Sequence, residues 1–112
     1  MSQFMLLLYD DPKSWQNATP ELMQTAMEKY RAWTTKPFTK GSARLAEDFG
    51  KVLRSIGGKP IASDGPYSET KEVLAGYYTI EAASYDDAVR IAKDHPHVEY
   101  GGTIEVRKVW EP

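Results

Sequence analysis

The stretch Asp64-Gly65-Pro66-Tyr67-Ser68-Glu69-Thr70-Lys71-Glu72 is the centre around which the chain is organised. Its opening predicts a tight bend. The Asp64 carboxylate can accept hydrogen bonds from nearby backbone amides, Gly65 tolerates positive φ, and Pro66 fixes its own φ. An aromatic side chain and several charged side chains follow directly. Two interpretations stay open: a charged, solvated loop between two strands, or a rigid bend that aims its carboxylates into a pocket.

A strand and a helix are predicted ahead of this bend. Gln3 to Tyr9 is a nearly continuous apolar run, which indicates a buried strand. Thr19 and Pro20 are typical of a helix start, because threonine caps the first free amides and proline suits the first helical position. An apolar stripe at helical spacing then runs to Trp33, and Pro37 requires the helix to end before it.

A hairpin, a second helix and two more strands are predicted in the rest of the chain. The hairpin joins Lys51 to Ile56 with Lys59 to Ser63 through Gly57-Gly58, since two glycines between β-prone runs are typical of a tight turn. The other expected elements are a strand over Gly76 to Ala82, a helix that Ser84 caps and Asp94-His95-Pro96 stops, and a last strand over Thr103 to Trp110.

The segment from Pro37 to Gly50 has no clear pattern. Ala43 to Phe49 fits a short helix capped by Ser42, or a loop that leads into the hairpin. The expected order is therefore strand, helix, hairpin, strand, helix, strand, which favours a split β-α-β arrangement with both helices on one sheet face. Such a sheet leaves its other face bare, and pairing with a second copy would bury that face.

The bend and the strand after it resemble the YCII-related proteins of the DGPF type. Their signature is Asp-Gly-Pro-Phe, then Glu-Thr-Lys-Glu, then a strand that begins Gly-aromatic-aromatic; here Tyr67 replaces the phenylalanine and Gly76-Tyr77-Tyr78 opens the strand. The closing Glu105-Val106-Arg107-Lys108-Val109 has lysine where the family usually has proline. The resemblance runs nearly end to end. It implies one domain over residues 1–112, with a ferredoxin-like α+β fold that carries an inserted β-hairpin and pairs into a dimeric α+β barrel.

Length and composition exclude several classes of protein. A chain of 112 residues fits one domain, and its content of 41% hydrophobic and 27% charged residues is ordinary for a globular protein. A net charge of −2 provides no basic field for nucleic acid or an anionic membrane. Cysteine is absent, and the first residues show no signal-peptide pattern, so we expect a cytoplasmic protein.

Three residues are candidates for proton transfer. A bend that partly buries Asp64 would make its carboxylate a general base or a ligand anchor, although it could equally serve to cap the turn. His95 and His97 are the only histidines, so any imidazole step must use one of them; otherwise they cap the end of the second helix. Candidate ligand-binding residues are Tyr9, Tyr67, Glu69, Lys71 and Arg107. No metal-ligand spacing is present, so we expect no metal.

The sequence lacks the nucleophile, phosphate-loop and dinucleotide motifs, which argues against common hydrolases, kinases and nicotinamide enzymes, and we expect no cofactor. Two hypotheses remain. The first is a small dimer that binds a small molecule in a pocket bordered by the Asp-Gly-Pro bend. The alternative is a cofactor-independent lyase or isomerase with an Asp–His pair. Some relatives in the wider superfamily resemble such enzymes, but their histidine lies on the first helix, and the matching helix here has none.

Overall fold

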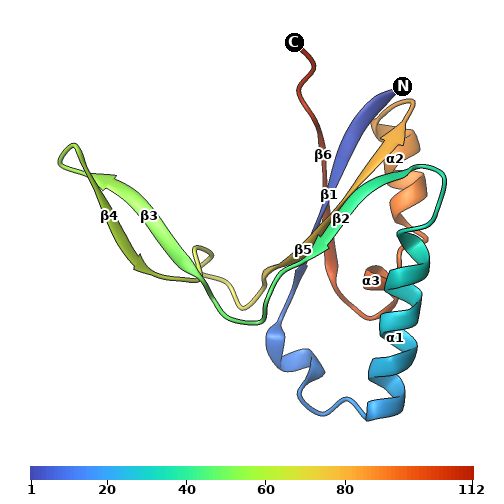
Figure 1. The fold of residues 1–112 in the computed structure, drawn as a ribbon, viewed down its shortest axis with the longest axis horizontal. Coiled ribbons are helices and arrows are strands. Elements are labelled where there is room, and N and C mark those ends of the chain that lie inside the picture. The colour runs from blue at the N-terminus through green and yellow to red at the C-terminus, as the bar shows by residue number, and fades with distance from the viewer.

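The computed structural model describes all residues 1–112 and shows a mixed α+β fold with one main antiparallel sheet (Figure 1). The sheet has the strand order β2-β5-β1-β6, and a separate two-stranded sheet pairs β3 with β4. The elements are β1 (Ser2–Asp10), a 3-10 turn η1 (Pro12–Trp15), α1 (Pro20–Trp33), β2 (Thr39–Arg44), β3 (Lys51–Ile56), β4 (Lys59–Asp64), β5 (Val73–Ala82), α2 (Tyr85–Ala92), α3 (Pro96–Glu99) and β6 (Thr103–Lys108). This order of strands and helices confirms the ferredoxin-like fold.

The hydrophobic core lies between the helices and one face of the sheet. Alternate residues of β1 point into it, because successive side chains of a strand face opposite sides. Phe4, Leu6 and Leu8 are buried, while Met5 and Leu7 between them are only half-buried. The strand β5 alternates in the same way, and α1 and α2 cover this face of the sheet. The core residues from these elements are Tyr78, Ile80 and Ala82 of β5, Trp33 of α1, and Ala88, Ile91 and Ala92 of α2.

Both main helices begin where the sequence predicts. The Thr19 hydroxyl accepts a hydrogen bond from the Leu22 amide at 3.1 Å, and Pro20 opens α1. Ser84 caps α2 by accepting from the Asp87 amide at 3.1 Å, and the Asp87 carboxylate accepts from the Ala83 amide at 2.9 Å. The hydrogen bond from Ala83 and the neighbouring Arg90 lower the pKa of that carboxyl. These reciprocal caps satisfy amides that a helix start leaves free.

The segment from Pro37 to Gly50, where the sequence showed no clear pattern, contains a strand. Of the two interpretations of Ala43 to Phe49, the loop into the hairpin is confirmed after Arg44 and the short helix is wrong. Residues Thr39–Arg44 form β2, which pairs antiparallel with β5 at the edge of the sheet. The sequence of β2 is polar and contains Gly41, so it lacks the apolar alternation that would identify a strand. Its pairing is fixed by the neighbouring β5. One further deviation is Trp110, which lies beyond β6 with 82% of its surface exposed.

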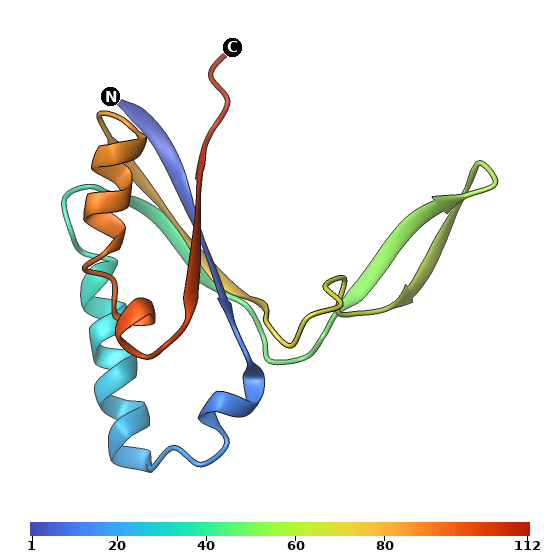
Figure 2. The same cartoon turned by 180° about the vertical axis from the view of Figure 1, so that it is seen from behind.

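The predicted hairpin is confirmed. It projects from the body of the molecule as an arm, here defined as Lys51–Asp64 (Figures 1 and 2). Gly57 and Gly58 form its turn with φ of 59° and 79°, which explains the pair of glycines, since the left-handed region disfavours other residues.

The sheet face opposite the helices stays uncovered, and we call it the open face (Figure 2). Strand register places Met5, Leu7 and Tyr77 on it, together with the predicted polar residues Glu105 and Arg107. These positions are half-buried or exposed, as expected for a face that no helix covers.

Candidate functional site

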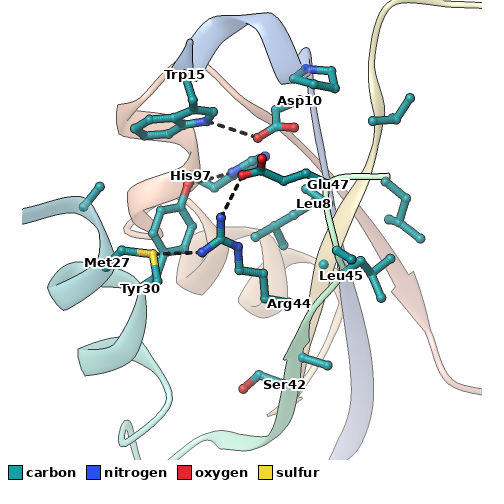
Figure 3. Close-up of a pocket in the computed structure, with 18 of the residues that line it drawn as sticks. Leu8, Asp10, Trp15, Met27, Tyr30, Ser42, Arg44, Leu45, Glu47 and His97 are labelled. Atoms are coloured by element: carbon teal, nitrogen blue, oxygen red, sulfur yellow. Dashed lines mark hydrogen bonds and ion pairs between the residues drawn. The ribbon is translucent and has the colours of Figure 1, made fainter. Parts of the chain in front are cut away.

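A pocket of about 390 Å³ lies between α1 and the sheet, where β1 ends and β2 leaves the body (Figure 3). Most of its lining is hydrophobic. Its apolar side chains include Leu8, Trp15, Met23, Met27, Leu45 and Leu74, which come from five separate segments of the chain. A largely apolar cavity of this size with a few polar groups is the usual form of a small-molecule site.

Tyr30 and His97 form the central polar pair in the pocket wall. The Tyr30 hydroxyl is 2.8 Å from Nδ1 of His97, and Nε2 of the same ring is 2.7 Å from the carbonyl oxygen of Tyr9. Because a carbonyl can only accept, Nε2 of His97 carries the hydrogen. In the neutral ring Nδ1 therefore accepts from the Tyr30 hydroxyl. The tautomer of His97 is thus fixed by the backbone of β1.

Burial and the nearby carboxylate of Asp10 keep the Tyr30 hydroxyl protonated, so it acts as a hydrogen-bond donor. The Tyr78 hydroxyl donates to the carbonyl oxygen of Tyr30 at 2.9 Å, which ties α1 to the sheet. Burial raises the pKa of Tyr30 above its ordinary range, and the negative charge of Asp10 raises it further. Burial likewise raises the pKa of Tyr78 to about 12. Both hydroxyls therefore stay protonated at neutral pH.

Charged side chains, among them Asp10, Arg44 and Glu47, also line the pocket (Figure 3). The Asp10 carboxylate accepts from the Trp15 indole N–H at 3.3 Å. The Arg44 guanidinium donates to Glu47 at 3.2 Å and contacts the sulfur of Met27 at 3.2 Å. Carboxylates and a guanidinium therefore both face the cavity, so the pocket offers acceptors and donors to a ligand.

The chain around α3 places the His97 ring. His95 takes an extended conformation and caps α3, its Nδ1 accepting from the His97 amide at 3.0 Å, and Pro96 occupies the first helical position. Gly102 lies against the His97 ring, and a Cβ at that position would overlap the imidazole. The absence of a side chain at Gly102 thus provides room for the histidine ring.

His95 sits behind the pocket in an aromatic cage. The rings of Trp33, Tyr78 and Tyr30 surround it, with centroids 4.6, 4.5 and 5.5 Å from the imidazole. Its Nε2 has no hydrogen-bond partner, and only 1% of the residue is exposed. Burial, with a smaller effect of His97, lowers the pKa of His95 to about 3. This ring is therefore neutral at pH 7 and does not line the pocket, and it caps α3 where the sequence had suggested the end of α2.

The other predicted catalytic residue, Asp64, lies outside the pocket. Its side chain is 84% exposed at the base of the arm and pairs with Lys51. It makes no hydrogen bond to either histidine. Tyr67 is also exposed and lies against the Arg54 guanidinium, 5.3 Å from the ring centroid. Glu69 and Lys71 are exposed and form no ion pair, so a single chain does not bring the charged bend and the pocket together.

Tyr9 and Arg107, two predicted ligand residues, meet on the open face. The Tyr9 hydroxyl donates to Glu105 at 3.2 Å, and Arg107 lies 3.9 Å from the other oxygen of the same carboxylate. Burial, followed by the bond to Glu105, raises the pKa of Tyr9. Tyr9 thus contacts the open face with its side chain and the pocket with its carbonyl oxygen, through His97.

Sequence reasoning missed the pocket residues Tyr30, Asp10, Trp15 and Arg44. Tyr30 lies in the apolar stripe that runs to Trp33, and the signal for it is its hydroxyl, which needs a partner when the ring is buried. Arg44 is the last residue of β2 and reaches the pocket only because that strand forms, and the sequence pattern does not indicate the strand. No group of three or more histidine, cysteine or carboxylate side chains could hold a metal ion.

The fold and pocket define the class: a ferredoxin-like α+β domain with an arm inserted before the third strand of its sheet and a mostly apolar cavity beside α1. The model of the YCII-related domain matches residues 2–112, so the chain belongs to the YCII-related family. Uncharacterized protein R00369 of Rhizobium meliloti (strain 1021) is 45% identical over 57 residues. That segment covers 50% of this chain and 46% of the relative. None of the helices is long and apolar enough to cross a membrane.

Proposed function

We propose that this protein binds a small molecule in the pocket beside α1. The supporting observation is the Tyr30–His97 pair in the wall of a largely apolar cavity of about 390 Å³. A ligand with an apolar body would contact Met23, Met27 and Leu74, and a polar group on it would hydrogen-bond to the Tyr30 hydroxyl. Concave apolar sites with a few fixed polar groups bind ligands of this kind.

We further propose that the functional unit is a homodimer that pairs through the open face. Met5, Leu7 and Tyr77 give this face an apolar centre, and no helix covers it. A sheet with one covered face normally buries its other face when that face is apolar. The Tyr9–Glu105–Arg107 cluster would then lie at the interface between the copies.

One observation favours an alternative, proton-transfer chemistry in the same pocket. His97 has a fixed tautomer and shares a hydrogen bond with a hydroxyl that stays protonated at neutral pH. In a cofactor-independent lyase or isomerase, the Tyr30 hydroxyl would be the group that gives a proton to the substrate or takes one from it, and Nδ1 of His97 would hold or return the proton of that hydroxyl. In this alternative, Tyr30 takes the place of Asp64 as the proton-transfer partner of His97.

The binding proposal is tested by native mass spectrometry with a panel of small aromatic and aliphatic carboxylic acids, ketones and phenols as probes. Ala46→Trp places a bulky ring at an exposed position that lines the pocket, so it should remove binding without unfolding the protein. Ala83→Trp is the matched control, since Ala83 is exposed and lies outside the pocket. The proposal would be contradicted if both variants bound the probes equally well. It would also be contradicted if the unmodified chain bound none of them.

A further inference from the structure

The arm, Lys51–Asp64, has no covering within its own chain. Its two strands pair only with each other and do not join the main sheet. Leu53 is 70% exposed on one face of the hairpin, and Ile56 is 60% exposed on the other, as register assigns them. An isolated two-stranded hairpin is only marginally stable in water. An arm with apolar side chains on both faces therefore needs a surface to cover it.

The charge of the arm is opposite to that of the body. The arm has three basic side chains, Lys51, Arg54 and Lys59, and one acidic side chain, Asp64, for a net charge of +2. The rest of the chain then has eleven basic and fifteen acidic side chains, for a net charge of −4. The body of a second copy therefore attracts the arm, whereas two arms repel each other.

The Asp-Gly-Pro bend fastens the arm at its base. The Gly65 amide donates to the carbonyl oxygen of Gly50 at 2.9 Å, which joins the two ends of the arm. Gly65 packs so closely that a Cβ would overlap the carbonyl oxygen of Phe49. Only glycine fits this contact. The bend therefore holds the arm in one direction, and a fixed arm loses less entropy when it docks.

The segments that connect the arm to the body also build the pocket. Residues Leu45 to Asp48 lead into the arm and line the cavity. The segment that leads back from the arm joins β5, whose first residues, Val73 to Ala75, line the cavity as well. A contact that fixes the arm therefore also fixes one wall of the pocket. This connection links the partner surface to the ligand site through the backbone.

We propose that the arm docks on the body of a second copy of this chain and thereby sets the wall of its own pocket. The partner is a second copy because the arm and the body are opposite in charge and the arm is apolar on both faces. This inference rests on the proposed homodimer and is independent of the proposed ligand. It assigns the Asp-Gly-Pro motif to the base of a dimerisation arm.

Sedimentation equilibrium of the full chain tests the docking. The double variant Leu53→Ser with Ile56→Ser removes apolar surface from both faces at exposed positions, so the fold of the body should be unchanged by circular dichroism. The dimer dissociation constant should rise about tenfold or more, since a few apolar anchors carry most of the affinity of an interface. The matched control, Leu22→Ser with Val89→Ser, removes two exposed apolar side chains from the helices and should leave the constant unchanged.

A second measurement locates the arm directly. The chain has no cysteine, so Ser55→Cys at the exposed end of β3 accepts a single spin label. In dimers mixed from labelled and isotope-enriched unlabelled chains, resonances of the unlabelled body should broaden. If the arm variant has the same dimer dissociation constant as the unmodified chain, the arm inference is overturned and the open-face dimer stands. The arm inference is also overturned if no resonance of the unlabelled body broadens. If the unmodified chain sediments as a monomer, both the open-face dimer and the arm inference are overturned.

Discussion

The Tyr30 hydroxyl lies 2.8 Å from Nδ1 of His97, across 67 residues of sequence. This contact joins α1 to α3, and the bond from His97 to the Tyr9 carbonyl at 2.7 Å continues it to β1. Three segments therefore meet at one imidazole ring in the pocket wall. The hydrogen-bond chain both positions the functional groups of the site and ties the helices to the sheet.

Removing the Tyr30 hydroxyl should weaken the fold moderately. Tyr30→Phe keeps the ring but leaves Nδ1 of His97 without its donor. A partly buried acceptor that loses its partner costs about 1 kcal/mol of unfolding free energy. Urea denaturation measures this change. The control is Tyr67→Phe, because the exposed Tyr67 hydroxyl makes no hydrogen bond, and its unfolding free energy should not change. Equal midpoints for both variants would show that the Tyr30 bond contributes nothing.

The tautomer of His97 is a separate expectation. Its Nε2 should carry the hydrogen at neutral pH, since the Tyr9 carbonyl accepts from it. Nitrogen chemical shifts of the imidazole, measured by NMR through the ring protons, distinguish the two neutral tautomers. In Tyr30→Phe the Nε2–H form should persist, because the backbone acceptor is unchanged. A hydrogen on Nδ1 in the unmodified chain would contradict the arrangement that we describe.

The sequence identified the fold but only part of the site, and the reason differs between elements. The strand β1 and the caps of α1 and α2 follow from local patterns, namely an apolar run and side chains that cap the next amides. Edge strand β2 has no such pattern, because its conformation depends on pairing with β5. Local signals therefore missed the element that brings Arg44 to the pocket.

The site itself depends on contacts that are far apart in sequence. His97 was a candidate because it is one of two imidazoles, but its hydrogen-bond partner Tyr30 could only be found by packing α1 against α3. Asp64 was chosen for the chemistry of its turn, and that turn lies at the base of the arm. The turn residues therefore predict that the backbone is rigid there, but they do not predict which surface of the molecule the Asp64 side chain faces.

His95 should make stability fall in acid. Its pKa is about 3 when folded and 6.5 in the unfolded chain, so the unfolded chain binds the extra proton between these values. The stability it contributes is complete above pH 6.5 and is lost as the pH falls toward about 3. The expected slope for this group is at most about 1.4 kcal/mol per pH unit.

The variant His95→Asn isolates this contribution. Asparagine can still accept from the His97 amide as a helix cap, but it does not titrate. The unfolding free energy of the variant, measured by urea at several pH values from about 7 down to about 4, should depend less steeply on pH than that of the unmodified chain. The smaller side chain lowers stability at all pH values, so only the slopes are compared. Equal slopes would show that His95 is not buried as a neutral ring.

Gly65→Ala should loosen the arm while leaving the main sheet folded. The added Cβ overlaps the carbonyl oxygen of Phe49, so the contact between the two ends of the arm must open. Amides of β3 and β4 that bond across the hairpin should exchange faster with deuterium, by about tenfold or more, because local opening exposes them without global unfolding. Amides of β1 and of the part of β5 from Gly76 to Ala82 serve as the internal reference. Gly41→Ala is the matched variant, since a Cβ there meets nothing within 4 Å, and exchange in its arm should match the unmodified chain. Because the arm and pocket share their connecting segments, faster exchange confined to the arm, with unchanged exchange at Leu45 and Leu74, would break the link between them.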